Sequence, residues 1–121
     1  MMIKILIVED QIITAMDMRM KLEDAGYEVT DIISFGEDVL QSVKANEPNL
    51  VLLDIGLAGK MNGIEAAKSI AEFDLPIIFL TAFNDKSSVG LAGKLNHSGF
   101  MAKPILNNKL FAAVEQALGS N

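Results

Sequence analysis

Short apolar runs bounded by polar or turn-forming residues recur along the chain and predict a series of β-strands. The clearest is 50–53, Leu-Val-Leu-Leu, which leads directly into Asp54. A run without alternation is typical of a strand buried on both faces, as in a parallel sheet. Similar runs predict strands at 3–8, 77–80 and 100–102. The more polar residues 28–33 predict a further strand at an edge of the sheet.

Helical patterns lie between these strands. We expect helices at 12–25, 36–46, 64–73, 85–95 and 106–118. Gly26 predicts the end of the first helix. Leu106, Leu110, Val114 and Leu118 recur every four residues and predict the packed face of the last. Each interval between strand starts exceeds the dozen or so residues that a parallel crossover requires. We therefore predict an α/β fold with a five-stranded parallel sheet and helices on both faces.

Composition narrows the class of protein further. The 121 residues predict one domain spanning 1–121, with no output domain after Leu118. A formal net charge of −6 argues against direct binding to nucleic acid, which favours a basic patch. The absence of cysteine excludes disulfides and thiolate metal sites. No segment approaches the roughly 18 apolar residues of a membrane span, so we expect a cytoplasmic protein.

Polar groups follow four of the five predicted strands: Glu9-Asp10, Asp54, Thr81 and Lys103. In a parallel sheet these strand ends share one edge, where open α/β sheets bind ligands. Three clustered carboxylates repel one another unless a cation is present, and oxygen ligands without Cys or His favour Mg²⁺. A hydroxyl and an ammonium suit an incoming phosphoryl group, and Asp54 would be its nucleophile. Each residue also has a simpler interpretation. Asp54 could cap a helix or form a turn, and Glu9-Asp10 could cap the following helix. Thr81 could be an ordinary strand-end residue, and Lys103 an ordinary surface residue.

At these residues the chain resembles the receiver domain of two-component response regulators, over essentially its whole length. The resemblance implies a flavodoxin-like sheet with strand order 2-1-3-4-5. It implies that Asp10 binds Mg²⁺ directly and Glu9 through water, with Asp54 and the backbone carbonyl of Gly56 as further ligands.

The resemblance also implies roles in signalling. Asp54 would accept the phosphoryl group, Thr81 would hydrogen-bond to it, and Lys103 would pair with one of its oxygens. Phe100 occupies the position of a rotating aromatic switch, and the Lys103–Pro104 bond would be cis. The domain would be a signalling receiver rather than an enzyme, with only self-phosphotransfer and slow autodephosphorylation.

Two departures from the family pattern concern the loop after Asp54. It lacks the proline that is common there, and Gly63 comes one position later than in the commonest form. We also expect slow loss of phosphate. The residues expected to flank the attacking water, Gly56 and Phe83, offer no hydrogen-bonding side chain to position it.

The expected phosphodonor is a histidine kinase or a histidine phosphotransfer protein. At about 100° per residue, Ala15, Met18, Leu22 and Ala25 share one side of the first helix and should face the sheet. Ile13, Met16 and Met20 lie nearly opposite and form a candidate docking surface for a helical donor. The resemblance implies a downstream protein target on the face formed by the fourth helix, fifth strand and fifth helix, and a possible homodimer on phosphorylation.

Two other functions remain open. The first is a pseudo-receiver, a binding module of the same fold whose partner recognition ignores phosphate. The second is a hydrolase that forms an aspartyl phosphate, although the sequence lacks the Asp-x-Asp arrangement typical of such enzymes. Incubation with Mg²⁺ and acetyl phosphate or beryllofluoride would separate a phosphorylatable switch from a pseudo-receiver.

Overall fold

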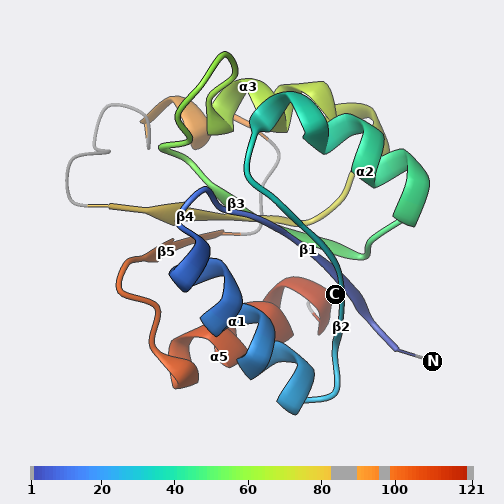
Figure 1. Cartoon of the computed structure of the whole chain (residues 1–121), viewed down its shortest axis with the longest axis vertical. Coiled ribbons are helices and arrows are strands. Elements are labelled where there is room, and N and C mark those ends of the chain that lie inside the picture. Colours follow the sequence, from blue (N-terminus) through green and yellow to red (C-terminus); the bar gives the residue numbers. More distant parts are fainter. Residues whose placement is uncertain (1, 83–89, 96–98, 120–121) are drawn as a thin grey trace.

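The computed structural model describes residues 2–82, 90–95 and 99–119 and contains one parallel five-stranded sheet. The order β2-β1-β3-β4-β5 confirms the predicted topology (Figure 1). The strands are β1 (Lys4–Val8), β2 (Glu28–Ile33), β3 (Leu50–Asp54), β4 (Ile77–Thr81) and β5 (Gly99–Ala102). β2 is an edge strand, as its polar sequence predicted.

Helices cover both faces of this sheet. In Figure 1, α1 and α5 lie on one face, and α2 and α3 lie on the other. The α-helices are α1 (Ile12–Asp24), α2 (Val39–Asn46), α3 (Gly63–Ser69) and α5 (Asn107–Gly119). None of the helices in the described part of the chain is long and apolar enough to cross a membrane.

Two of the predicted helices are shorter than expected. The helix predicted at 36–46 starts with a 3₁₀ turn, η1 (Gly36–Asp38), before α2 begins. The helix predicted at 64–73 ends in a second 3₁₀ turn, η2 (Ala71–Phe73). Single 3₁₀ turns are frequent at helix ends because i→i+3 bonds satisfy backbone groups there. Of the helix predicted at 85–95, residues 90–92 are helical, whereas 85–89 lie outside the described residues.

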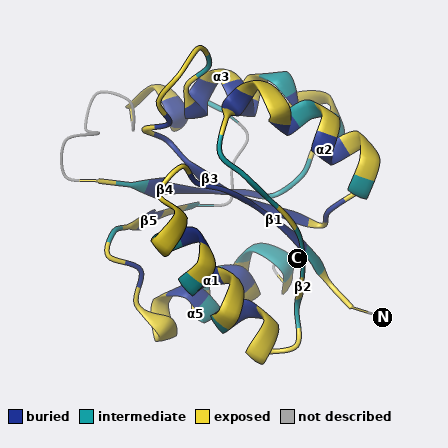
Figure 2. Cartoon of the chain, viewed as in Figure 1, coloured by how far each residue is buried: buried dark blue, intermediate teal, exposed yellow. Residues whose placement is uncertain are grey.

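The central strands are buried on both faces, as their unbroken apolar sequence predicted (Figure 2). On β1, Leu6 and Val8 belong to the cluster beneath α2 and α3, while Ile5 and Ile7 belong to the cluster beneath α1 and α5. The side chains of β3 divide in the same alternating way. Because β3 is buried on both faces, its last residue, Asp54, is held in place at the end of the strand.

The predicted packing of α1 is correct except at its end. Ala15, Met18 and Leu22 are fully buried, whereas Ala25 is exposed. Ala25 is the residue at which the helix ends, and Gly26 follows with φ +96°, so the chain has turned away from the helix axis.

The packed face predicted for the last helix is wrong at its first residue, Leu106. Leu110 and Val114 are fully buried and Leu118 packs partly against the same cluster. Leu106 precedes the first residue of α5 and is exposed, so the helical period does not apply to it.

Candidate functional site

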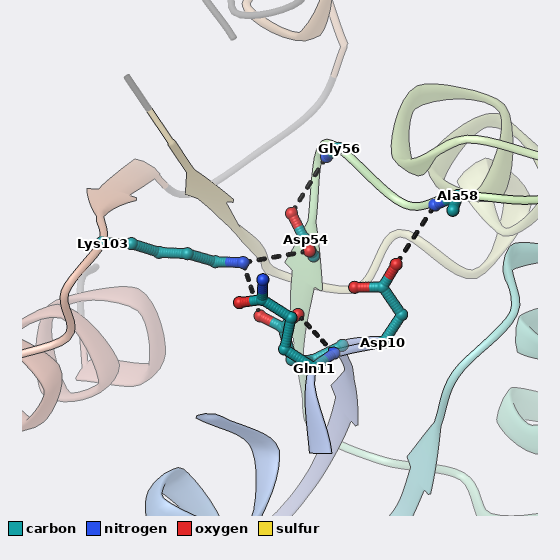
Figure 3. Close-up of polar contacts among 7 residues, drawn as sticks. Asp10, Gln11, Asp54, Gly56, Ala58 and Lys103 are labelled. Carbon is teal, nitrogen blue, oxygen red and sulfur yellow. Dashed lines mark hydrogen bonds and ion pairs between the residues drawn. The ribbon is translucent and has the colours of Figure 1, made fainter. Parts of the chain in front are cut away.

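The strand ends bring the predicted polar residues to one edge of the sheet, where Figure 3 shows Asp10, Asp54 and Lys103. Glu9 and Asp10 follow β1, Asp54 ends β3, and Thr81 ends β4. Lys103 follows β5 and reaches across the edge to the carboxylates of the other strands. Because all five strands are parallel, residues far apart in sequence meet here.

An ion-pair network occupies the centre of the site. The ammonium nitrogen Nζ of Lys103 lies 2.8 Å from Oε1 of Glu9 and 3.1 Å from Oδ2 of Asp54. Glu9 is 0% exposed and Asp54 is 4% exposed. The sequence predicted that clustered carboxylates need a cation, and in this structure Lys103 supplies one positive charge between two of them.

Both carboxylate oxygens of Asp54 have partners. Its Oδ1 accepts a hydrogen bond from the backbone amide of Gly56 at 2.9 Å, and Oδ2 accepts one from Lys103. The amide of Gly56 comes from the turn that directly follows β3. The side chain of Asp54 is thus held in a fixed orientation at the end of a rigid, buried strand.

Asp10 differs from the other two acids because it is exposed to solvent. Its Oδ2 accepts a hydrogen bond from the backbone amide of Ala58 at 3.3 Å. No pattern in the sequence indicates a role for Ala58, since an alanine carries no chemical signal and its contribution comes from the main chain alone. Figure 3 shows the second oxygen of Asp10 pointing toward Asp54.

Burial dominates the electrostatics of Glu9 and raises its pKa from 4.5 to about 7. Contacts with the Lys103 ammonium and the Gln11 amide oppose this rise, while the charge of Asp54 adds to it. The Gln11 amide donates to Oε2 of Glu9 at 3.0 Å. Burial by itself lowers the pKa of Lys103, but its contacts with Glu9 and Asp54 outweigh that effect, and the net shift is upward.

The three acids fit a divalent metal ion. One ligand oxygen from each of Glu9, Asp10 and Asp54 lies within 4.8 Å of the others. Within the described part of the chain, Oε1 of Glu9 is buried and no donor makes a hydrogen bond of good geometry to it, although Lys103 lies at ion-pair distance. Three clustered carboxylates, none of them accompanied by a cysteine or histidine ligand, suit Mg²⁺, which prefers carboxylate and carbonyl oxygens.

The structure places the other predicted site residues around this centre. Thr81 is half-buried at the end of β4, and its carbonyl accepts a hydrogen bond from the Lys103 amide at 2.8 Å. The Lys103–Pro104 peptide bond is cis, as predicted. Phe100 is exposed on β5, and its ring stacks on that of Phe79 with 5.6 Å between centroids. The switch roles of Thr81 and Phe100 stay predictions, and Phe83 lies outside the described residues.

An apolar stripe lies on the outer face of α1. Ile13 is 82% exposed, Met16 48% and Met20 57%, as the helical period predicted. The structure adds Ile12, which is 62% exposed. Charged residues flank the stripe in two pairs along the helix, Asp17 with Lys21 and Arg19 with Glu23. A groove lined by Gln11, Ile13, Thr14, Asp17, Lys103, Pro104 and Ile105 connects the stripe to the acidic site.

Curated relatives resemble this chain along most of its length. PdtaR, a transcriptional regulatory protein of Mycobacterium tuberculosis, is 30% identical over 116 residues, covering 95% of this chain and 56% of the relative. The protein CcdB of Bacillus subtilis is 32% identical over 120 residues, covering 98% of this chain and 99% of the relative. The chain spans about half the length of most of the curated relatives it matches.

Solved structures agree with this similarity. The signal receiver domain of a modulated diguanylate cyclase from Desulfovibrio desulfuricans superposes with a TM-score of 0.91 at 33% identity, covering 98% of this chain and 95% of that one. The N-terminal domain of a response regulator, sensory box and GGDEF protein from Carboxydothermus hydrogenoformans gives 0.87 at 34% identity, covering 96% and 94%.

The family model for the response regulator receiver domain matches residues 5–115. That range contains every residue of the acidic site and Lys103. Receiver domains are signalling domains rather than enzymes of the usual kind. They act in phosphorylation-dependent signalling with histidine kinases and downstream targets, and in general they bind Mg²⁺. This chain belongs to the response regulator receiver domain family.

Proposed function

We propose that this chain is a signalling switch that accepts a phosphoryl group on Asp54 from a phosphohistidine donor. One observation carries the proposal. The carboxylate of Asp54 is fixed at the end of the central strand β3, in contact with the ammonium of Lys103 and clustered with the acids Glu9 and Asp10. A nucleophile, a fixed positive charge and a metal-binding group are what phosphoryl transfer requires.

In the proposed reaction, one oxygen of Asp54 attacks phosphorus as the phosphorus–nitrogen bond of the donor breaks. The leaving imidazole keeps the bonding electron pair and takes a proton from solvent, and Asp54 becomes an acyl phosphate. Glu9, Asp10, Asp54 and the Gly56 carbonyl would hold Mg²⁺, which would supply positive charge to offset that of the phosphoryl oxygens. Lys103 already lies 3.1 Å from Asp54 and supplies a second positive charge. Thr81 contributes a hydroxyl donor from the end of the neighbouring strand.

The test is labelling of the purified chain with acetyl phosphate in Mg²⁺, read by intact-protein mass spectrometry. We expect one phosphoryl group on the parent, none on Asp54→Asn, and none on the parent in EDTA. Beryllofluoride should shift the NMR signals around Asp54 in the same Mg²⁺-dependent way. Labelling that survives in Asp54→Asn would place the acceptor elsewhere. A folded parent that takes no label would favour the pseudo-receiver, which binds partners without phosphate.

The donor protein is proposed to dock on the apolar stripe of α1, formed by Ile12, Ile13, Met16 and Met20. These side chains are exposed and lie on one face of a helix, and Ile13 lines the groove that leads to Lys103. An exposed apolar stripe beside a reactive group suits a helix of the phosphohistidine donor.

Substitution of the stripe should separate docking from chemistry. We expect Met16→Asp to slow transfer from a phosphorylated histidine phosphotransfer domain about tenfold or more, because a buried unpaired carboxylate is costly in the interface. Labelling by acetyl phosphate should stay unchanged. Leu91→Asp, at an exposed apolar position away from α1, is the matched control. Equal loss of both reactions in Met16→Asp would show that the substitution damages the site itself.

A further inference from the structure

We propose that the backbone amide of Ala58 positions Asp10 for metal binding. The amide donates to Oδ2 of Asp10 at 3.3 Å, across 48 residues of sequence. Figure 3 shows that the other oxygen of Asp10 points toward Asp54, into the cluster of acids. One oxygen is thus used for orientation while the second stays available to a metal ion.

Asp10 needs such a partner more than the other two acids do. Glu9 and Asp54 are buried and held by Lys103 and by nearby backbone amides, whereas Asp10 is exposed. An exposed carboxylate samples several rotamers, and fixing it on metal binding costs conformational entropy. A hydrogen bond that holds the ligand in place beforehand reduces that cost. Loss of such partners in metal sites typically weakens binding by about 10–100-fold.

The loop that carries Ala58 is itself anchored. The Gly56 amide bonds to Asp54, and the side chain of Leu57 is buried in the core beneath α2 and α3. Gly63, at the start of α3, packs directly on the backbone of Asp54 and Ile55. The Ala58 amide is therefore presented from a fixed loop. Position 58 is an alanine and so carries the N–H that this bond requires, which a proline would lack.

The inference rests on the proposed function, and its first test is a substitution that removes only the N–H. We expect Ala58→Pro to raise the Mg²⁺ dissociation constant, measured by isothermal titration calorimetry, by about tenfold or more. Ala58→Leu keeps the amide and is the conservative variant, so it should bind Mg²⁺ within about twofold of the parent. Circular dichroism melting in EDTA establishes that each variant is folded. Tight Mg²⁺ binding by a folded Ala58→Pro chain would overturn the proposal.

A second measurement uses the unaltered loop and decides the question if Ala58→Pro does not fold. In the parent, the Ala58 amide should be protected from hydrogen exchange both in EDTA and in saturating Mg²⁺. In Asp10→Ala this protection should be lost. If Mg²⁺ itself abolishes the protection in the parent, the amide competes with the metal and the proposal is wrong.

The two proposals fail in different ways. A parent chain that binds Mg²⁺ but takes no label from acetyl phosphate contradicts the function proposed for Asp54 and leaves the role of Ala58 intact. A parent that is labelled, while Ala58→Pro binds Mg²⁺ normally, contradicts the role of Ala58 alone.

Discussion

At the scale of single residues, Lys103 holds the metal-free site together. It lies within ion-pair distance of two buried carboxylates, Glu9 and Asp54, and its side chain is itself mostly buried. Removing Lys103 would leave both buried carboxylates without a counter-charge, and breaking a buried ion pair in this way typically costs about 3–5 kcal/mol. The same ammonium is also the positive charge nearest the proposed acceptor. The stability of the metal-free fold and the proposed transfer of a phosphoryl group to Asp54 therefore both depend on the side chain of Lys103.

The raised pKa of Glu9 predicts how the stability of the metal-free chain varies with pH. The pKa of Glu9 is about 7 in the folded chain, above its ordinary value of 4.5. Between these two pH values the folded chain therefore keeps a proton that the unfolded chain has released. The contribution of Glu9 to the free energy of unfolding should fall as pH rises from about 4.5 to about 7 and stay constant above that range.

Urea denaturation in EDTA at several pH values between about 5 and 8 would measure this slope. Glu9→Gln cannot ionise, so it should lose the slope and be more stable than the parent near neutral pH. Parallel pH profiles for the parent and Glu9→Gln would show that another group is responsible.

Gly56 predicts the lifetime of the phosphorylated state. An acyl phosphate is hydrolysed by a water in line with the bond that breaks, and exposed Gly56 has no side chain to orient that water. We expect slow loss of phosphate, and faster loss in Gly56→Asn, whose amide can hydrogen-bond to water. The measurement is a time course of phosphate release in excess Mg²⁺ after the phosphodonor is removed. If phosphorylated Gly56→Asn decays as slowly as the parent or more slowly, the missing side chain at position 56 does not limit hydrolysis.

At the scale of elements, the junction between β3 and α3 determines where Asp54 and its loop lie. Asn62 caps α3 by accepting from the Glu65 amide at 2.9 Å, while the Glu65 side chain accepts from the Asn62 amide at 3.0 Å. This reciprocal capping box fixes the first turn of α3. Gly63 then lets that turn approach the backbone of β3, because a Cβ on it would lie 2.6 Å from Cα of Ile55.

Adding one methyl group at this junction should therefore disturb the site. We expect Gly63→Ala to lower the free energy of unfolding by about 2–3 kcal/mol, since backbone atoms cannot move aside cheaply. Labelling of Asp54 should slow as the acceptor shifts.

Gly90→Ala is the matched control, because a Cβ there meets nothing within 4 Å. Gly90 is exposed and helical, so this change should stabilise the chain by about 0.4–1 kcal/mol. Chemical denaturation of both variants measures the two changes. A Gly63→Ala chain as stable as the parent would show that α3 can shift without cost.

At the scale of the whole molecule, charge distribution links stability to metal binding. The chain carries a formal net charge of −6, and three of its acids converge at one edge of the sheet. Lys103 offsets this concentration only in part. A divalent cation that binds the folded chain and not the unfolded chain should therefore stabilise the whole domain.

Mg²⁺ should raise the melting temperature by mass action. At ten times its dissociation constant the gain is about 1.4 kcal/mol, which corresponds to about 5 °C for a domain of this size. Asp54→Asn removes one clustered charge, so it should melt higher than the parent in EDTA and gain less from Mg²⁺. Differential scanning calorimetry with Ca²⁺-free buffers measures both effects. An unchanged melting temperature in millimolar Mg²⁺ would contradict the metal site.

The sequence by itself determined the elements and the edge at which chemistry occurs. Apolar runs such as 50–53 do not alternate with polar residues, which is typical of strands buried on both faces, and the polar ends of such strands meet at one edge of a parallel sheet. The helical period also separated buried Met18 from exposed Met16. These features depend on residues close together in the chain, so local patterns were sufficient. The pattern was wrong at Ala25 and Leu106 because it could not place the helix ends.

Only the tertiary structure decided how the site is held. The shared contacts of Lys103 with Glu9 and Asp54, the raised pKa of Glu9 and the bond from Ala58 to Asp10 all join segments far apart in sequence. Their strength depends on distances of a few ångströms and on burial by several elements at once. A backbone amide also looks the same at every position in a sequence. Its role exists only when folding brings it within hydrogen-bond distance of a carboxylate.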